Sequence, residues 1–343
     1  MRQLLNTLYI TRPNAYLSLN GKNIVIKEDN QTIGRYPLHN IESIVLFSNL
    51  GMSPQLMGKC VDNHISICFL TPNGRFRARV VGRSYGNVLL RKKQYKVSMD
   101  DAECVKISIN FILGKIYNQK WLIERYIREY PLRIQGELLK NISYQLTEYM
   151  NCVKTCTELD SLRGFEGKAQ VCYFQGFNEL ILNQKKEFVF NGRNKRPPQD
   201  PVNSLLSFAY TLLSNDIASA LETVGLDSYV GFMHQDRPGR ISLALDLIEE
   251  LRAPIADRFV LSLINRQQVK FEDFIINDNG AVLIKDEARK KILSEWQKRK
   301  QEKLKHPFLD EKIPWGLVPY AQSMLLARYL RGDLNEYPPF FWK

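Results

Sequence analysis

Two acidic residues and one histidine in the second half of the chain have the types and the spacing of a metal site. Asp246 and Glu249 stand three residues apart in a stretch with helical periodicity, so their carboxylate oxygens can converge on one point. Carboxylates side by side repel one another unless a cation or a proton lies between them. His234, on the loop before this helix, would add an imidazole and complete a set of nitrogen and oxygen ligands. The alternative is an amphipathic helix whose acidic face is solvated.

The elements that must position these residues predict an α+β protein. Short β-type runs separated by turn residues predict an N-terminal β-sandwich domain over residues 1–90. The period then becomes helical, which predicts a larger all-α catalytic domain over residues 91–343. The helices expected in this second domain cover residues 86–97, 100–129, 131–158, 164–181, 202–223, 258–265, 271–274 and 286–305.

The composition is that of an ordinary globular protein with an excess of positive charge. Of its 343 residues, 44% are hydrophobic and 24% are charged, and the formal net charge is +12. Such an excess favours a polyanionic partner, either nucleic acid or an anionic membrane surface. No apolar run is long enough to span a membrane, and the first residues lack the pattern of a signal peptide. We therefore expect a cytoplasmic protein without a membrane partner.

Three basic segments favour nucleic acid as that partner. Residues 75–97 hold eight Arg or Lys residues and no acidic residue, a second cluster lies at residues 193–196, and a third lies at residues 285–305. Such surfaces suit a phosphate backbone, and a solvated strand or helix face is the alternative. The candidate DNA contacts in these segments are Arg75, Arg77, Arg79, Arg193, Lys195, Arg196, Lys298 and Arg299.

Four motifs, in order along the chain, resemble those of a known family. The first is RGFEGKA at residues 163–169, and the second is RPPQDPVNSLLS at residues 196–207. The third is VGFMH at residues 230–234, and the fourth is SLALDLIE at residues 242–249. Together they resemble the CRISPR-associated spacer-acquisition integrases, the family of CRISPR-associated protein 1.

This resemblance implies a metal site. The family joins an N-terminal β-sandwich to a helical catalytic domain, as the patterns above also predict. Its ligands would fall on Glu166, His234 and a carboxylate of the fourth motif, for which we choose Glu249. Asp246 would be a further ligand or would support one, whereas Glu250 has no matching role and is expected to be solvated. The implied metal is Mg²⁺ or Mn²⁺, which carboxylates and imidazole suit.

The implied activity is that of a metal-dependent DNA endonuclease and integrase of CRISPR adaptation. A 3′-hydroxyl of protospacer DNA would attack the CRISPR repeat by transesterification, and water in its place would nick DNA. His234 as a general base is a second interpretation of that residue. Tyr173 either positions the scissile phosphate or packs in the core, and Arg163 and Lys168 are candidate phosphate contacts. A structure-selective DNase of DNA repair and a non-catalytic nucleic-acid-binding scaffold are the rival interpretations.

The implied partners are double-stranded DNA, from the protospacer and the CRISPR repeat, and other protein chains. The family forms a homodimer that a second small adaptation protein, CRISPR-associated protein 2, bridges to another dimer. The segments LARYLRG at residues 326–332 and YPPF at residues 337–340 resemble the type I-C subtype, whose assembly can include an accessory adaptation nuclease. The apolar residues Phe340, Phe341 and Trp342 would anchor on the body of the protein or on a partner.

Overall fold

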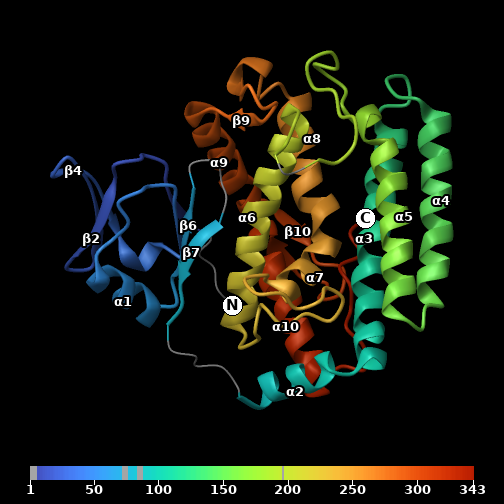
Figure 1. Cartoon of the computed structure of the whole chain (residues 1–343), viewed down its shortest axis with the longest axis horizontal. Coiled ribbons are helices and arrows are strands. Elements are labelled where there is room, and N and C mark those ends of the chain that lie inside the picture. The colour runs from blue at the N-terminus through green and yellow to red at the C-terminus, as the bar shows by residue number, and fades with distance from the viewer. Residues whose placement is uncertain (1–5, 72–75, 83–87, 195–196) are drawn as a thin grey trace. The chain divides into compact units, whose positions relative to one another are not determined.

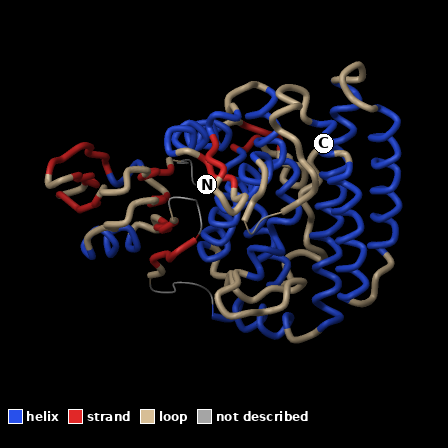
Figure 2. Tube along the Cα trace, turned by 45° about the horizontal axis from the view of Figure 1, so that its top comes forward, coloured by secondary structure: helices blue, strands red, loops and turns tan. Residues whose placement is uncertain are grey.

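Two compact units make up the chain, and each is described by itself (Figures 1 and 2). This computed structural model describes residues 6–71, 76–82, 88–194 and 197–343. The first unit comprises Met1–Tyr85, Ile284–Glu302 and Pro314–Leu317. The second comprises Gly86–Leu283, Lys303–Ile313 and Val318–Lys343.

Two sheets and a hydrophobic core form most of the first unit, as the predicted α+β class requires. Within the described residues, one sheet has the strand order β1-β5-β6-β7 and the other the order β2-β3-β4. One buried cluster includes Leu17 and Ile24 from the second sheet and Ile44 and Ile67 from the first. The elements are β1 (Thr7–Ile10), β2 (Tyr16–Asn20), β3 (Asn23–Glu28), β4 (Gln31–Pro37), β5 (Ser43–Leu46), α1 (Pro54–Asp62), β6 (Ser66–Leu70) and β7 (Phe76–Val80).

Helix α9 (Asp286–Gln301) also belongs to the first unit, although the sequence analysis assigned it to the helical domain. The guanidinium of Arg289 on α9 lies 5.7 Å from the ring centre of Phe47, which follows β5. The first unit therefore contains a helix that lies far beyond residue 90, the predicted end of the N-terminal domain.

Helices form most of the second unit. They are α2 (Val88–Ser98), α3 (Asp101–Glu129), α4 (Gly136–Lys154), α5 (Leu159–Gln175), α6 (Pro201–Thr223), α7 (Ser242–Leu251), α8 (Arg258–Asn265) and α10 (Val318–Arg331). Helices α3, α4 and α5 pack side by side (Figure 1). Because α3 also packs on α7 and α6 covers another side of it, nine of the ten residues of α7 are buried. Among the described helices, none combines the length and the apolar character needed to cross a membrane.

A π-helical turn, η3 (Arg252–Asp257), joins α7 to α8 around Pro254. Proline has no N–H, so the carbonyl four residues earlier loses its usual helical donor. That carbonyl belongs to Glu250, and Nδ2 of Asn118 on α3 donates to it at 2.7 Å. The end of α7 is therefore fixed to α3 at the point where its own hydrogen-bond ladder is interrupted.

The segment after α10 packs into the second unit. Tyr337 and Phe340 are buried, and Nδ2 of Asn118 donates to the carbonyl of Phe340 at 2.7 Å. The N–H of Trp342 donates back to Oδ1 of Asn118 at 2.9 Å. Of the two anchors expected for this segment, the structure shows the one on the body of the protein.

Several predicted element bounds were wrong. The helix expected over residues 131–158 is the shorter α4, and α5 begins five residues before the expected start at residue 164. The helix expected over residues 271–274 is one 3-10 turn, Phe271–Asp273, and Phe274 already begins a strand. The second domain is also not all-α, because it contains short two-stranded sheets formed by β8 (Phe274–Ile276) with β9 (Val282–Ile284) and by β10 (Lys303–Lys305) with β11 (Lys312–Pro314). The fold is thus α+β, with strands first and a mostly helical part after them.

Candidate metal centre

Two of the predicted ligands meet at a buried lysine in the second unit. Nζ of Lys115 on α3 pairs with Oε1 of Glu166 on α5 and lies 2.8 Å from Oε2 of Glu249 on α7. The side chains of Lys115 and Glu249 are 1% and 3% exposed, whereas that of Glu166 is 21% exposed. Three helices therefore direct one cation and two carboxylates to a single point, and Glu166 is the member most open to solvent.

A second cation completes the surroundings of Glu249. Nη2 of Arg252 lies 3.1 Å from Oε1 of Glu249, so each carboxylate oxygen has its own positive partner. Burial by itself would raise the pKa of Glu249, but Arg252 and Lys115 more than offset this and lower the pKa to about 2. Glu249 is therefore ionised at neutral pH, as a metal ligand must be.

His234 is held in place by Asp246. Nδ1 of His234 lies 2.6 Å from Oδ1 of Asp246. The same carboxylate accepts hydrogen bonds from the backbone N–H groups of Phe232, Met233 and His234, at 2.6, 3.1 and 2.9 Å. An ionised carboxylate only accepts, so Nδ1 carries the hydrogen of this contact, and the tautomer with its hydrogen on Nδ1 leaves the lone pair of Nε2 for a metal ion. Both oxygens of Asp246 are thus engaged with the loop, which fits the supporting role, one of the two expected for this residue.

Gly231 allows the His234 loop to pass close to Asp246. A Cβ atom at Gly231 would lie 2.8 Å from Cβ of Ser242 and 2.9 Å from Oδ2 of Asp246. Contacts this short would push the loop away from α7. The third motif therefore has a physical reason for its glycine.

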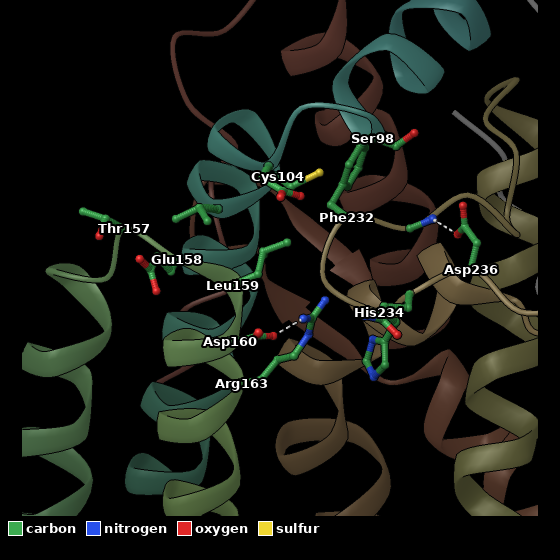
Figure 3. Close-up of a pocket in the computed structure, with 14 residues that line it drawn as sticks. Ser98, Cys104, Thr157, Glu158, Leu159, Asp160, Arg163, Phe232, His234 and Asp236 are labelled. Atoms are coloured by element: carbon green, nitrogen blue, oxygen red, sulfur yellow. Dashed lines mark hydrogen bonds and ion pairs between the residues drawn. The ribbon is translucent and has the colours of Figure 1, made fainter.

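Arg163 ties the His234 loop to α5. Its Nε and Nη2 atoms donate to the carbonyl of Met233 at 3.1 and 2.6 Å, and its Nη1 atom lies 2.7 Å from Oδ1 of Asp160 (Figure 3). Glu166 stands one helical turn after Arg163, so this contact brings Glu166 and His234 to the same region. The guanidinium that we expected to contact phosphate is thus engaged with protein groups.

A cavity of about 450 Å³ lies beside the contact between Arg163 and the His234 loop. Arg163 and His234 both line it, from α5 and from the loop before α7 (Figure 3). Its other charged lining residues are Asp101, Glu158, Asp160 and Asp236. His234 of the candidate centre therefore adjoins a space that solvent or a ligand can enter.

Glu166, Glu249 and His234 are of the types that bind a divalent cation, but the three side chains do not surround one point in this structure. Within residues 6–71, 76–82, 88–194 and 197–343, no three His, Cys, Asp or Glu side chains stand close enough to hold one ion. The ammonium of Lys115 takes the position between Glu166 and Glu249, where two carboxylates require a cation. Two carboxylates and one imidazole are donors that Mg²⁺ or Mn²⁺ accepts. The chemistry of these residues therefore fits the implied metal.

Of the two roles expected for Tyr173, the structure shows packing in the core, and positioning of the scissile phosphate is corrected. Its side chain is fully buried, and its hydroxyl donates to Oδ2 of Asp257 at 2.9 Å. The hydroxyl of Tyr210 donates to the other oxygen of the same carboxylate. Burial raises the pKa of Asp257, and these two hydrogen bonds oppose that shift. Tyr173 therefore supports the turn after α7 through packing and one hydrogen bond.

Glu250 is buried, so the expectation that it would be solvated was wrong. Its carboxylate accepts from the hydroxyl of Tyr337, from Nε2 of Gln322 at 2.9 Å and from the N–H of Phe340 at 2.7 Å. Burial raises the pKa of Glu250 to about 7, and the three hydrogen bonds oppose that rise. The error arose because α7 is enclosed on both faces, which an amphipathic pattern does not reveal.

The predicted DNA contacts differ in exposure. Lys168 on α5 and Lys298 on α9 are exposed, and Lys298 lies 2.7 Å from Glu295. Arg77 on β7 is also exposed and donates to Oδ1 of Asn49 at 3.0 Å. These three remain candidate contacts for a phosphate backbone.

The other predicted DNA contacts are partly buried against residues of this chain or lie outside the described residues. Arg193 is half-buried, and its guanidinium donates to Oδ1 of Asn203 at 2.6 Å and to Oγ of Ser207 at 2.9 Å. Arg299 is half-buried 4.8 Å from the ring centre of Trp315, within the first unit. Arg79 is half-buried on β7. The remaining three, Arg75, Lys195 and Arg196, lie outside the described residues.

Sequence reasoning missed Lys115 and Arg252. A signal for Lys115 was present, because it follows Ile107 and Phe111 at intervals of four and so falls on the buried face of α3. A lysine in such a position needs a partner of opposite charge. A signal for Arg252 was also present, because it stands three residues after Glu249, a spacing at which opposite charges pair on a helix.

Comparison with known proteins identifies the family. A model of the family described as CRISPR associated protein Cas1 matches residues 8–298, so the chain belongs to the Cas1 family. It is 49% identical over 347 residues to CRISPR-associated endonuclease Cas1 2 of Rhodospirillum rubrum, and the match covers both chains completely. It is 45% identical over 343 residues to CRISPR-associated endonuclease Cas1 1 of Chlorobaculum tepidum, again over the whole of both chains.

Solved structures share the fold at lower sequence identity. A casposase bound to an integration product has a TM-score of 0.85 and 22% identity, over 99% of this chain and 95% of that one. A Cas1 protein from Thermotoga maritima has a TM-score of 0.82 and 20% identity, over 95% of this chain and 97% of that one. The order of strands followed by helices is therefore an arrangement that these proteins have in common.

Proposed function

We propose that this protein is a divalent-metal-dependent DNA endonuclease and integrase of CRISPR adaptation. It joins the 3′-hydroxyl ends of protospacer DNA to the CRISPR repeat by transesterification. The proposal rests on one observation, the convergence of Glu166 and Glu249 from different helices on a single cation position. The endonuclease names of the relatives at 49% and 45% identity support the same chemistry.

Glu166, His234 and Glu249 are the residues that would hold Mg²⁺ or Mn²⁺. Such an ion, when bound, polarises the phosphoryl oxygen and stabilises the charge that develops on the leaving oxygen. Asp246 fixes the tautomer of His234 through Nδ1 and leaves Nε2 for the site. Arg252 keeps Glu249 ionised, and Arg163 holds the loop of His234 against the helix of Glu166.

Double-stranded DNA is the substrate that the charge distribution supports. The chain has a formal net charge of +12, and Arg77, Lys168 and Lys298 present exposed cations. Phosphate contacts of this kind hold DNA without reading its sequence. Recognition of the repeat would then need further contacts, from this chain or from partners.

A homodimer with CRISPR-associated protein 2 is the assembly that we propose. A chain of a Cas6-RT-Cas1–Cas2 complex shares this fold with a TM-score of 0.82 and 22% identity, over 36% of that chain. The endings at residues 326–332 and 337–340 favour a type I-C-like subtype with an accessory adaptation nuclease. Size-exclusion chromatography of the purified chain with and without the smaller protein tests the assembly.

The activity is tested with a labelled DNA duplex that has free 3′-hydroxyl ends and a plasmid that carries the repeat. We expect Glu166→Gln and His234→Ala to lower strand transfer in Mn²⁺ by about 100-fold or more, because the loss of a supporting residue alone costs about 10- to 100-fold. Glu148→Gln, at an exposed position on α4, is the control and should keep full activity. Full activity in both site variants would contradict the assignment.

Analysis of the DNA products shows whether a 3′-hydroxyl or water is the nucleophile. Strands joined to the plasmid indicate attack by a 3′-hydroxyl, whereas nicks with free 5′-phosphates indicate attack by water, as in a structure-selective DNase of DNA repair. DNA binding without either product, with or without a chelator, would instead indicate a nucleic-acid-binding scaffold.

A further inference from the structure

We propose that Lys115 is a positioning residue of this centre, whose ammonium holds Glu166 and Glu249 together in the metal-free protein and leaves them when a divalent cation binds. The inference rests on the proposed function, and it adds a residue that none of the four motifs contains. Lys115 thus acts as a resident cation that the incoming metal ion must replace.

Lys115 is buried, so its charge requires partners of opposite sign. A buried ammonium strongly destabilises the folded protein unless it is paired. Lys115 is 1% exposed, and its partners are Glu166, 51 residues later, and Glu249 on a third helix. Neither pairing is local in the sequence, so the ion pairs hold α5 and α7 to α3.

The backbone of α3 is shaped for this contact. At Gly114, the residue before Lys115, a Cβ atom would lie 2.8 Å from Cβ of Glu250 and 3.2 Å from Cβ of Pro339. Glycine therefore lets α3 approach the end of α7 more closely than any other residue would. This approach brings Nζ of Lys115 to within 2.8 Å of Glu249.

The charges around the two carboxylates balance without a metal ion. Glu166 and Glu249 contribute two negative charges, and Lys115 and Arg252 contribute two positive ones. A divalent cation at the same point would add two further positive charges. Because like charges a few ångströms apart repel, the ammonium and the metal ion compete for the same oxygens.

The first test compares Mn²⁺ binding by Lys115→Met with that by the wild type. The variant should melt at a lower temperature in EDTA, because its two carboxylates lose their shared cation. It should bind Mn²⁺ at least about tenfold more tightly by calorimetry, because the competitor is gone. Lys106→Met removes a lysine from the same helix that is exposed and paired with Glu103, and it should bind Mn²⁺ as the wild type does.

The outcomes distinguish this inference from the function on which it rests. Unchanged or weaker Mn²⁺ binding by Lys115→Met, with normal binding by the wild type, overturns the role of Lys115 alone. No Mn²⁺ binding by the wild type overturns the metal site of the proposed function, and the role of Lys115 with it.

A second test uses the wild-type chain, so it does not depend on the folding of a variant. Lysines are labelled with an amine-reactive reagent in EDTA and in saturating Mg²⁺, and the labelled peptides are quantified by mass spectrometry. Labelling of Lys115 should be slow in EDTA and faster in Mg²⁺, whereas labelling of Lys106 should be equal in both. Equal protection of Lys115 in both conditions overturns the proposal.

Discussion

Nδ1 of His234 lies 2.6 Å from Oδ1 of Asp246, a fully buried carboxylate that also accepts hydrogen bonds from three successive backbone N–H groups. One side chain therefore fixes both the path of the loop and the orientation of the imidazole on it. Asp246 acts on the chemistry of the centre through His234.

Asp246→Asn tests this relationship. An amide of the same shape cannot accept at both oxygens, so one of its present donors would face an NH₂ group. We expect strand transfer and Mn²⁺ affinity to fall by about 10- to 100-fold. Asp236→Asn is the matched control, because Asp236 is exposed on the same loop and accepts a longer hydrogen bond, of 3.3 Å, from the N–H of Gly231. Equal effects of the two substitutions would contradict the role given to Asp246.

Gly114→Ala tests the close approach of α3 and α7. Alanine favours a helix over glycine by about 1 kcal/mol, but its Cβ would meet Cβ of Glu250 at 2.8 Å. We expect a net loss of about 1 to 3 kcal/mol in the free energy of unfolding, measured with urea. Gly136→Ala on α4 meets no heavy atom within 4 Å and should be neutral or slightly stabilising. A variant at Gly114 that is as stable as the wild type would show that the contact relaxes without cost.

The buried carboxylate of Asp257 should make the free energy of unfolding depend on pH. Burial raises the pKa of Asp257 above its ordinary value of 3.8, so the folded protein keeps this proton to a higher pH than the unfolded chain does. Its contribution to stability is therefore complete below that ordinary value and is lost as the pH rises through the raised pKa. The free energy of unfolding of the wild type, relative to Asp257→Asn, should fall as the pH increases from about 4.

Urea unfolding of both chains at a series of pH values measures this difference. Asp278→Asn serves as the control, because Asp278 is exposed between β8 and β9, and its curve should run parallel to that of the wild type. A constant difference between wild type and Asp257→Asn across the series would contradict the raised pKa.

The β strands could be predicted because their signals are local. Strand β4, from Gln31 to Pro37, is one of the short β-type runs from which the N-terminal β-sandwich was predicted. The turn before it uses Asp29 and Asn30 at φ angles of 48° and 63°, a region that aspartate and asparagine tolerate. Alternating apolar residues between such turns specify strands without knowledge of the rest of the fold.

The candidate centre could be predicted only in part. The motifs named Glu166, His234 and Glu249, but their distances depend on how α3, α5 and α7 pack. Lys115 meets partners 51 and 134 residues further along the chain, and no local pattern records such a pairing. The solvation expected for Glu250 failed for the same reason, because its neighbours are Gln322, Tyr337 and Phe340.

Asn118 holds the carbonyls of Glu250 and Phe340 with one amide group, and 222 residues separate it from Phe340. During synthesis on the ribosome, α3 emerges long before the segment that shares this amide with α7. The junction that supports Glu249 thus stays incomplete until residue 340 has left the exit tunnel.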